Sequence, residues 1–101
     1  MAQDNPNYPV GTASVSWVDG SGNSHIRVYS TDGYNVSERA WDTNAWTTTS
    51  FSASGGQVSA TCYPVGGGNV NIRVYCNFED KTVEYCSDAG GAWYVGGYST
   101  T

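Results

Sequence analysis

The sequence is poor in charge, and poorest in positive charge. Of its 101 residues only 13% are charged, with four Lys or Arg against nine Asp or Glu, so the formal net charge is -5. Nucleic acids and anionic membranes are bound mainly by basic surfaces. The composition therefore argues against both as partners.

Long apolar runs are also missing. No stretch approaches the roughly 20 apolar residues of a membrane-spanning helix, and residues 1–7 lack the charged start and apolar run of a secretory signal. We therefore expect a soluble protein without membrane insertion that is cytoplasmic or released by a non-classical route. Residues 1–11, with Pro6 and Pro9, are expected to form a loosely packed lead-in.

The three cysteines, Cys62, Cys76 and Cys86, lie in the second half of the chain and have no spacing typical of a metal site. We therefore expect neither a metal ion nor another cofactor. An odd number leaves at least one thiol without a partner in the chain. A disulfide between Cys62 and Cys76 depends on the register of their strands, which the sequence leaves open.

What the sequence does contain is a repeat. The tetrapeptide Ile-Arg-Val-Tyr of residues 26–29 recurs at residues 72–75, and the same shift of 46 positions superposes further residues without a gap. These further pairs are Trp17 and Tyr63, Asn23 and Asn69, Glu38 and Glu84, and Asp42 and Asp88. A repeat of this length indicates a tandem duplication of one structural unit.

Gly, Ser, Thr and Asn are abundant and aromatic residues reach 14%, which favours short β-strands joined by tight turns. We predict an all-β fold with four strands per repeat. The predicted strands are 12–18, 24–30, 36–41 and 46–51 in the first repeat and 57–63, 69–76, 82–86 and 93–98 in the second, with residues 52–56 as the link.

Four antiparallel strands in about 45 residues have the dimensions of one β-propeller blade. We therefore predict one domain, residues 12–101, made of two tandem blades at about 12–54 and 57–101. Two blades cannot close a ring, whereas propellers have about four to eight. A head-to-tail interface that closes would give a ring, so we predict a homotrimer with six blades, and a dimer with four blades is the alternative.

Each repeat places an Arg and a Glu on neighbouring strands, Arg27 with Glu38 and Arg73 with Glu84. Sugar hydroxyls can donate to a carboxylate and accept from a guanidinium in one geometry, and such charge-assisted hydrogen bonds are strong. The same pair could instead be a structural salt bridge.

Tryptophans follow each pair, Trp41 and Trp46 in the first repeat and Trp93 in the second. An indole offers an apolar platform to the C–H face of a sugar and an N–H donor to a hydroxyl. Core packing is the alternative role for each of them, but the repeated combination of Arg, Glu and Trp favours carbohydrate binding.

The Ile-Arg-Val-Tyr tetrapeptide, the later Glu-Arg-Ala-Trp-Asp, and Trp46 and Phe51 beyond it resemble the repeat of the fucose-binding lectin family of six-bladed β-propellers. This family is known from fungi and from small bacterial lectins with two blades per chain, and the likeness covers about residues 13–99. The resemblance implies multivalent recognition of L-fucose and fucosylated extracellular glycans at clefts between adjacent blades, without metal and without catalysis. It also supports the trimer.

The resemblance implies an inter-chain cleft with Arg73 and Glu84 from one chain and Trp41 and Trp46 from its neighbour. In the family the Arg and Glu come from one blade and the aromatic residues from the next. Two further candidates are Ser50, at a position where the family uses a backbone contact, and Val70, which would touch the methyl group of the sugar.

The implied intra-chain cleft pairs Arg27 and Glu38 with residues of the second repeat. Here Ser87 replaces the first Trp, and Trp93 follows a one-residue insertion near residues 90–91; Gly97 is the backbone-contact candidate. Losing a hydrogen-bonding partner costs about 1–3 kcal/mol, or roughly one to two powers of ten in affinity. We therefore predict two unlike sites per chain, the inter-chain one stronger.

Two other classes of function fit the sequence less well. A glycosidase would need two carboxylates on one substrate, but the repeat places Glu38 and Glu84 in different clefts. The sole histidine, His25, aligns with Asn71, so we interpret it as an ordinary strand residue and predict that the protein is not an enzyme. A propeller with shifted sugar specificity, or a structural or protein-binding propeller, remains the alternative.

Overall fold

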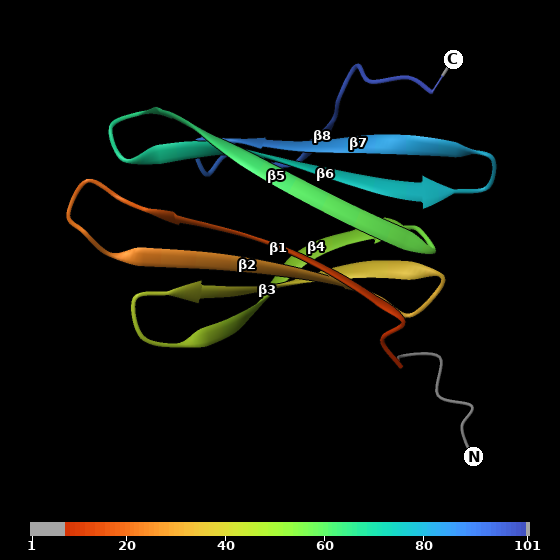
Figure 1. The fold of residues 1–101 in the computed structure, drawn as a ribbon, viewed down its shortest axis with the longest axis horizontal. Helices are drawn as coiled ribbons and strands as arrows, with labels where there is room; N and C mark the ends of the chain where they lie inside the picture. Colours follow the sequence, from red (N-terminus) through yellow and green to blue (C-terminus); the bar gives the residue numbers. More distant parts are fainter. Residues whose placement is uncertain (1–7, 101) are drawn as a thin grey trace.

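The computed structural model describes residues 8–100, and in this range the chain forms two four-stranded antiparallel sheets (Figure 1). Each sheet is a meander in which consecutive strands pair, and we call the sheets blade 1 and blade 2. Blade 1 contains β1 (Gly11–Val18), β2 (Ser24–Thr31), β3 (Asn35–Asp42) and β4 (Trp46–Ser54), and blade 2 contains β5 (Gln57–Gly66), β6 (Asn69–Phe78), β7 (Lys81–Asp88) and β8 (Tyr94–Val95). The predicted all-β fold of two four-stranded units is confirmed.

Alternation along the strands sets which side chains face the other blade. On β3, Val36, Glu38 and Ala40 are buried whereas Ser37 and Arg39 are exposed. This period of two is the geometry of a strand with one face packed and one solvated. A carboxylate thus lies among the buried positions of β3, which makes Glu38 unusual.

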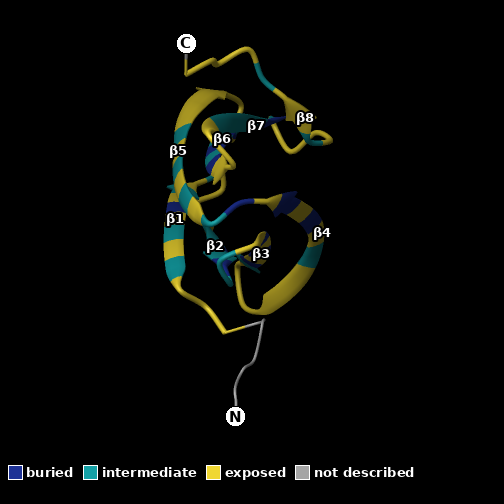
Figure 2. Ribbon diagram, turned by 90° about the vertical axis from the view of Figure 1, so that its right-hand side faces the viewer, coloured by how far each residue is buried: buried dark blue, intermediate teal, exposed yellow. Residues whose placement is uncertain are grey.

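The hydrophobic core lies between the two blades. Figure 2 shows the sheets stacked with β1 and β5 along the same side. The buried cluster combines residues of blade 1, namely Val15, Tyr29, Val36, Phe51 and Ala53, with residues of blade 2, namely Val70, Ile72, Val74 and Cys76. Because both blades contribute, neither half has a core of its own.

The link between the blades depends on one glycine. A Cβ atom at Gly55 would lie 2.9 Å from Cβ of Cys76 and 3.2 Å from Cγ2 of Val36. The peptide N–H of Gly55 donates to the carbonyl of Tyr34, and the hydroxyl of Thr31 donates to the carbonyl of Gly55. The chain therefore crosses from β4 to β5 in a space that only glycine fits.

Several predicted strand boundaries are wrong. β5 continues to Gly66 and does not end at residue 63. β4 continues to Ser54, so the link consists of two glycines only. The last strand, predicted at 93–98, is reduced to Tyr94–Val95, because Gly96 and Gly97 follow and the N–H of Tyr98 donates to the carboxylate of Glu84 at 3.1 Å. Glycine weakens strands, and a peptide group bonded to a side chain is lost to the ladder.

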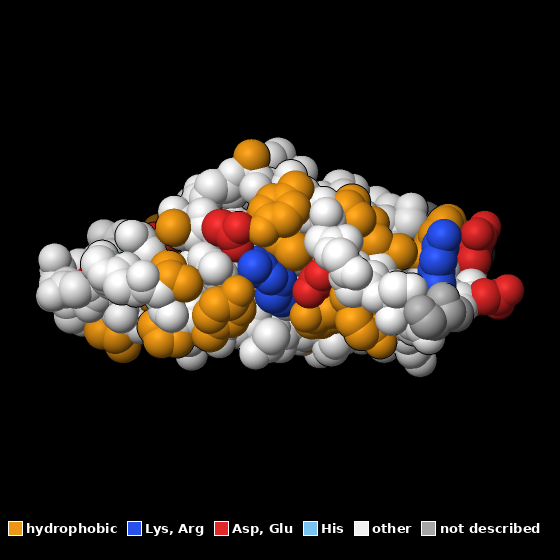
Figure 3. All heavy atoms as spheres, turned by 90° about the horizontal axis from the view of Figure 1, so that it is seen from above, with side chains coloured by type: hydrophobic (Ala, Val, Ile, Leu, Met, Phe, Trp, Pro, Cys, Tyr) orange, Lys and Arg blue, Asp and Glu red, His pale blue; other side chains and the backbone are white. Residues whose placement is uncertain are grey.

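Equivalent residues of the two repeats differ in burial. Tyr29 of blade 1 is fully buried, whereas its repeat partner Tyr75 is partly exposed; conversely, Val74 of blade 2 is fully buried and its partner Val28 is partly exposed. Blade 2 therefore covers the arginine-bearing face of blade 1, while the same face of blade 2 remains open. Figure 3, which views the molecule from the blade 2 side, shows hydrophobic, basic and acidic side chains gathered there.

The remaining expectations concern cysteines, the membrane and the N-terminal segment. Cys62, Cys76 and Cys86 are all free thiols, so the possible disulfide is not formed. The described residues include no helix with the length and apolar character needed to cross a membrane. Most of the expected lead-in, residues 1–7, lies outside the described residues, and β1 begins at Gly11.

Candidate functional site

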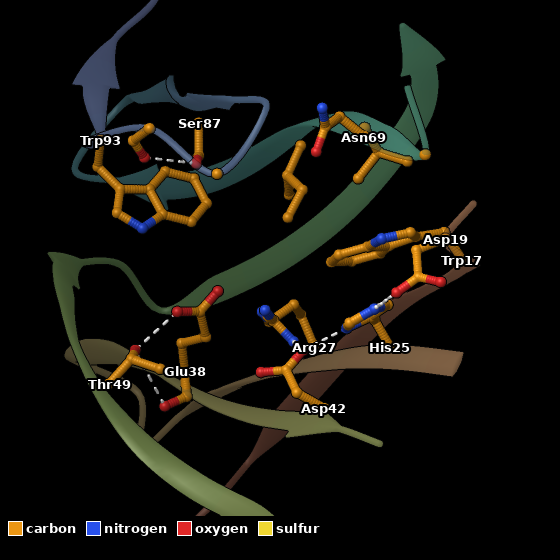
Figure 4. A pocket seen from close by; sticks show the side chains of 15 residues that line it. Trp17, Asp19, His25, Arg27, Glu38, Asp42, Thr49, Asn69, Ser87 and Trp93 are labelled. Carbon is orange, nitrogen blue, oxygen red and sulfur yellow. Dashed lines mark hydrogen bonds and ion pairs between the residues drawn. The ribbon is translucent and has the colours of Figure 1, made fainter. Parts of the chain in front are cut away.

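A cleft of about 410 Å³ opens between the two blades of the chain (Figure 4). The lining residues come from both sheets. Blade 1 and its first turn contribute Trp17, Asp19, His25, Arg27, Glu38, Asp42 and Thr49, and blade 2 contributes Gly68, Asn69, Val70, Ile72, Ser87, Gly90, Gly91 and Trp93. The structure thus brings together Arg27, Glu38, Ser87 and Trp93, which the family resemblance assigns to the intra-chain cleft.

The side chain of Arg27 extends from β2 into the cleft, and one of its nitrogens, Nη1, makes its hydrogen bonds to the rest of the chain. Nη1 donates to Oδ1 of Asp42 at 3.0 Å and also to the carbonyls of Ile26 and Trp41. The guanidinium lies over the Trp17 ring, 5.1 Å from its centroid. Among the described residues, Nη2 and Nε have no hydrogen-bond partner, so these donors remain for a ligand.

Glu38 lies diagonally across the β2–β3 ladder from Arg27, since its direct register partner is Tyr29. Its side chain is 5% exposed. Oε2 accepts a hydrogen bond from the hydroxyl of Tyr29 at 2.7 Å, and Oε1 accepts one from the hydroxyl of Thr49 at 2.6 Å. Each carboxylate oxygen can accept a second bond, so Glu38 is fixed in position yet still able to bind hydroxyl groups.

Among the described residues, Arg27 and Arg73 form ion pairs with Asp42 and Asp88 and not with the repeated glutamates. The alternative that Arg27 and Glu38 form a structural salt bridge is therefore wrong. The two groups line one cleft and are oriented by different neighbours, which leaves both available to a polar ligand.

Blade 2 repeats this arrangement on its open face. Arg73 donates from Nη1 to Asp88 at 2.7 Å and from Nη2 to the hydroxyl of Tyr63 at 3.1 Å. The bond to Asp88 raises the pKa of Arg73 further above its usual value, so this guanidinium stays charged. Glu84 accepts from the hydroxyl of Tyr75 at 2.8 Å. The arginine and glutamate of the expected inter-chain cleft are thus preformed in one chain.

Glu38 and Glu84 differ in the second group that donates a hydrogen bond to the carboxylate. The residue that corresponds to Thr49 in blade 2 is Gly96, where an added Cβ would lie 2.1 Å from Oε1 of Glu84. Glu84 therefore fills space that a side chain occupies in blade 1, and it accepts from the backbone N–H of Tyr98 instead. The two sites are unlike in detail even before any partner is added.

Trp93 and Ser87 have different roles at the blade 2 wall of the cleft. The Trp93 ring packs on Phe51 with centroids 4.6 Å apart and edge-on to Tyr29 at 6.3 Å. Ser87 is 5% exposed, and its hydroxyl donates to the carbonyl of Gly91 at 2.8 Å. Ser87 thus stabilises the turn that carries the inserted residue, while Trp93 presents an aromatic surface.

Trp41 and Trp46 lie away from this cleft, as expected for residues that complete a different one. They are register partners on β3 and β4 with ring centroids 5.6 Å apart. Trp46 is 44% exposed, in contrast to its counterpart Trp93, which packs against the other blade. An exposed indole of this size is available for a contact outside the chain.

The remaining candidates, Val70, Ser50 and Gly97, lie in different parts of the structure. Val70, expected in the inter-chain cleft, instead lines the intra-chain cleft, because β6 turns its Val70 face toward blade 1. By the repeat, Ser24 is its counterpart for the inter-chain cleft. Ser50 is exposed on β4, and Gly97 lies in open space beyond β8; neither lines the cleft of Figure 4.

A cluster at one end of the cleft was not predicted. His25 lies between two carboxylates, with Nε2 2.8 Å from Oδ2 of Asp19 and Nδ1 2.5 Å from Oδ1 of Asp42. Its ring stacks on Trp17 with centroids 5.2 Å apart. Hydrogen bonds to Asp19 and Asp42 raise the pKa of His25, and the bond from His25 lowers the pKa of Asp19 to about 2. The interpretation of His25 as an ordinary strand residue is therefore wrong.

Sequence reasoning also left the partners of the arginines and glutamates unassigned. Asp42 and Asp88 follow their arginines by 15 positions in both repeats, and Tyr29 and Tyr75 end the repeated tetrapeptide. Residues two apart on a strand share a face, so this signal was available. Thr49 carried no such signal, since the second repeat has glycine there.

The donors in the cleft suit hydroxyl groups rather than a metal ion. Within residues 8–100, no three His, Cys, Asp or Glu side chains are grouped so that they could hold a metal. A buried carboxylate, a guanidinium with open donors and an indole together can orient a small polyhydroxylated molecule that has one apolar face.

Comparisons with known proteins agree with this chemistry. A family described as fungal fucose-specific lectin matches residues 6–101. Among solved structures, a fucose lectin from Kordia zhangzhouensis in complex with methyl-fucoside is 38% identical with a TM-score of 0.73, over 87% of this chain and 64% of that one. The chain thus spans less than two thirds of that lectin. A comparison with curated proteins gave no match.

Proposed function

Because the chain belongs to the fungal fucose-specific lectin family, we propose that it binds L-fucose and fucosylated extracellular glycans at clefts between propeller blades. Lectins bind carbohydrates without transforming them, so the protein is not an enzyme. The observation that carries the proposal is the cleft in which Arg27 and Glu38 are each anchored by other residues and share no ion pair.

In the intra-chain cleft, the open Nη2 and Nε of Arg27 donate to ring and hydroxyl oxygens of the sugar, and Glu38 accepts from its hydroxyls. Trp93 supplies the apolar platform, and Val70 and Ile72, both less than 10% exposed, offer an apolar wall to the methyl group of fucose. Ser87 gives no stacking surface, so this site is the weaker of the two.

The inter-chain cleft combines Arg73 and Glu84 with Trp41 and Trp46 of a second copy. Support comes from contacts between aromatic side chains that occur at equivalent positions of the two repeats. Tyr29 meets Phe51 edge-on at 5.6 Å, and Tyr75 meets Tyr98 in the same way at 5.7 Å. In the intra-chain cleft Trp93 covers the first of these pairs. In the second pair the covering indole is absent from the chain, and Trp46 of a neighbour fits that position.

This complementarity supports assembly into a closed ring. By the repeat, the open face of blade 2 is equivalent to the face of blade 1 that blade 2 covers. Likewise, the open face of blade 1 is equivalent to the face of blade 2 that blade 1 covers. An interface between unlike faces is heterologous, and it closes into a cyclic oligomer when the rotation between neighbouring copies completes a circle. We propose a homotrimer with six blades and two sites per chain, whose several sites on one ring raise avidity for glycan-coated surfaces by about 10²–10⁴.

The proposal is tested by retention on immobilised L-fucose. Wild-type protein should be retained and should elute with free L-fucose but not with D-galactose. The double substitution of Glu38→Gln and Glu84→Gln, which keeps side-chain volume and removes the charged acceptors, should abolish retention. Elution by D-galactose but not by L-fucose would show that the protein recognises a different sugar. An assembled ring that is not retained would contradict the lectin function.

A further inference from the structure

The intra-chain cleft contains an ionisable group that the inter-chain cleft lacks. His25 lines the cleft beside Arg27, and the repeat places the uncharged Asn71 at the corresponding position beside Arg73. Since the chain has one histidine, this is a chemical difference between two otherwise repeated sites, in a pH range where no other residue type ordinarily titrates.

The geometry around His25 favours a charged ring. Its two nitrogens face carboxylate oxygens, Nε2 toward Asp19 at 2.8 Å and Nδ1 toward Asp42 at 2.5 Å. A neutral imidazole has one N–H and one lone pair, so it can satisfy only one of these carboxylates and would turn a lone pair toward the other. The doubly protonated ring, which donates to both carboxylates, fits this arrangement best.

The contact with Asp42 connects His25 to the sugar-binding guanidinium. Oδ1 of Asp42 accepts from Nδ1 of His25 and also from Nη1 of Arg27 at 3.0 Å. Trp17 lies against both side chains, stacked on the His25 ring and 5.1 Å from the guanidinium of Arg27. The carboxylate that orients Arg27 is thus itself oriented by His25.

The charges near His25 can be named from each neighbouring element. Asp19 comes from the turn after β1, Asp42 from the end of β3 and Arg27 from β2 itself. Across the cleft, the β5–β6 turn presents Gly68 and Asn69, which carry no charge. Asp19 and Asp42 therefore balance His25 and Arg27, the cleft contains the further carboxylate of Glu38, and deprotonation of His25 leaves an excess of negative charge beside Arg27.

In the Arg73 site the same task is done without a histidine. Asp88 accepts from Nη1 of Arg73 at 2.7 Å and from the hydroxyl of Tyr94 at 2.5 Å. Asp88 raises the pKa of Tyr94 to about 12, so this hydroxyl keeps its proton throughout the neutral range. The aspartate that orients Arg73 consequently has the same donors from pH 6 to 9.

We propose that His25 is a positioning residue that holds Arg27 for sugar binding through Asp42, so that the intra-chain cleft loses affinity for fucose as His25 deprotonates while the inter-chain cleft does not. This inference rests on the proposed function and adds a regulation specific to one of its two sites. At acidic pH both classes of site bind fucose at full strength. At alkaline pH only the inter-chain sites of the ring do so.

The single histidine makes a direct test possible. In wild-type protein, the ring C–H resonances of His25 are followed by NMR between pH 5 and 9, without sugar and with saturating methyl α-L-fucoside. Affinity coupling is reciprocal, so a loss of about three- to tenfold, as expected for one hydrogen bond, requires the titration midpoint to rise by about 0.5–1 pH unit in the presence of fucoside. A midpoint unmoved by saturating fucoside would overturn the proposal.

A calorimetric titration in the Arg73→Ala background isolates the intra-chain cleft. Its affinity for methyl α-L-fucoside should fall about three- to tenfold between pH 6 and pH 9, and the further substitution His25→Asn, which installs the residue of the other repeat, should make it independent of pH. His25→Gln provides a second neutral variant in case His25→Asn does not fold. Affinity equally independent of pH with His25 present would contradict the inference alone, whereas no fucoside binding by wild-type protein at any pH would contradict the proposed function as well.

Discussion

Arg27 donates from Nη1 to Asp42 at 3.0 Å, and among the described residues its Nη2 and Nε have no hydrogen-bond partner. The same relation recurs between Arg73 and Asp88 at 2.7 Å. Because Asp42 and Asp88 accept the hydrogen bonds that orient the two arginines, Glu38 and Glu84 remain separate acceptors in their sites. Each site thus keeps a guanidinium and a carboxylate separately available for the neutral sugar of the proposed function.

The first prediction concerns the two arginines. Arg27→Ala and Arg73→Ala should each lower the affinity of one class of site by about ten- to a hundredfold, since a hydrogen bond from a charged group contributes about 1.5–3 kcal/mol. Calorimetry with methyl α-L-fucoside should show half of the sites lost in each variant. Arg39→Ala, at an exposed arginine of β3 outside the cleft, is the matched control and should bind as wild type. Equal losses in all three variants would contradict the assignment.

The second prediction concerns ring closure. Trp46→Ala should weaken the proposed trimer, because the exposed indole is expected to pack on Tyr98 and Tyr75 of a neighbour, and an aromatic hot-spot residue contributes about 2 kcal/mol or more to an interface. Sedimentation should then show a shift toward single chains of 10.8 kDa. Tyr34→Ala removes an aromatic that is 76% exposed in a turn and should leave the mass unchanged. A Trp46→Ala trimer as stable as wild type would refute this contact.

The third prediction concerns the link between the blades. Gly55→Ala should lower the free energy of unfolding by about 1–3 kcal/mol, as for overpacking in a close-packed core, because its Cβ would meet Cys76 at 2.9 Å. Chemical denaturation at fixed protein concentration measures the change. Gly97→Ala, with no atom within 4 Å of the added Cβ, should be neutral in stability. Equal stability of the two variants would show that the link accommodates a Cβ at position 55 without cost.

The fourth prediction is a pH dependence of stability. The carboxylates of Asp19 and Asp42 raise the pKa of His25 above its ordinary value of 6.5, so its stabilising contribution is complete below pH 6.5 and is lost as the pH rises through the folded-state pKa. The melting temperature should therefore fall between pH 6 and pH 9 more in wild type than in His25→Asn. Parallel pH profiles of the two proteins, measured at one concentration, would show that His25 is not coupled to folding.

Much of the fold was predictable because it is repeated. The tetrapeptide at residues 26–29 and 72–75 aligned the two units and placed Arg27 and Glu38 on adjacent strands, where the structure has them. The end of the chain was not predictable in this way. An aromatic-rich segment favours a strand, yet the hydrogen bond from the N–H of Tyr98 to Glu84 is a tertiary contact that no local pattern encodes.

The chemistry of the site was only partly predictable. The repeat pointed to the arginines, glutamates and tryptophans, but it drew attention away from His25, which is not repeated and which the structure places between Asp19 and Asp42. Contacts between a turn, β2 and β3 depend on how the strands twist and on the exact reach of side chains. Repetition identifies what the two sites share, and only the structure shows how they differ.

The most direct test of the account is a calorimetric titration of the wild-type protein with methyl α-L-fucoside, with its mass in solution measured beforehand. The account predicts a mass of about three times 10.8 kDa and two classes of site, one of each per chain, with the tighter class lost in Arg73→Ala. Absence of binding heat from a correctly assembled ring would contradict fucose recognition, and a single class of two identical sites per chain would contradict the distinction between the Ser87 cleft and the Trp41 and Trp46 cleft.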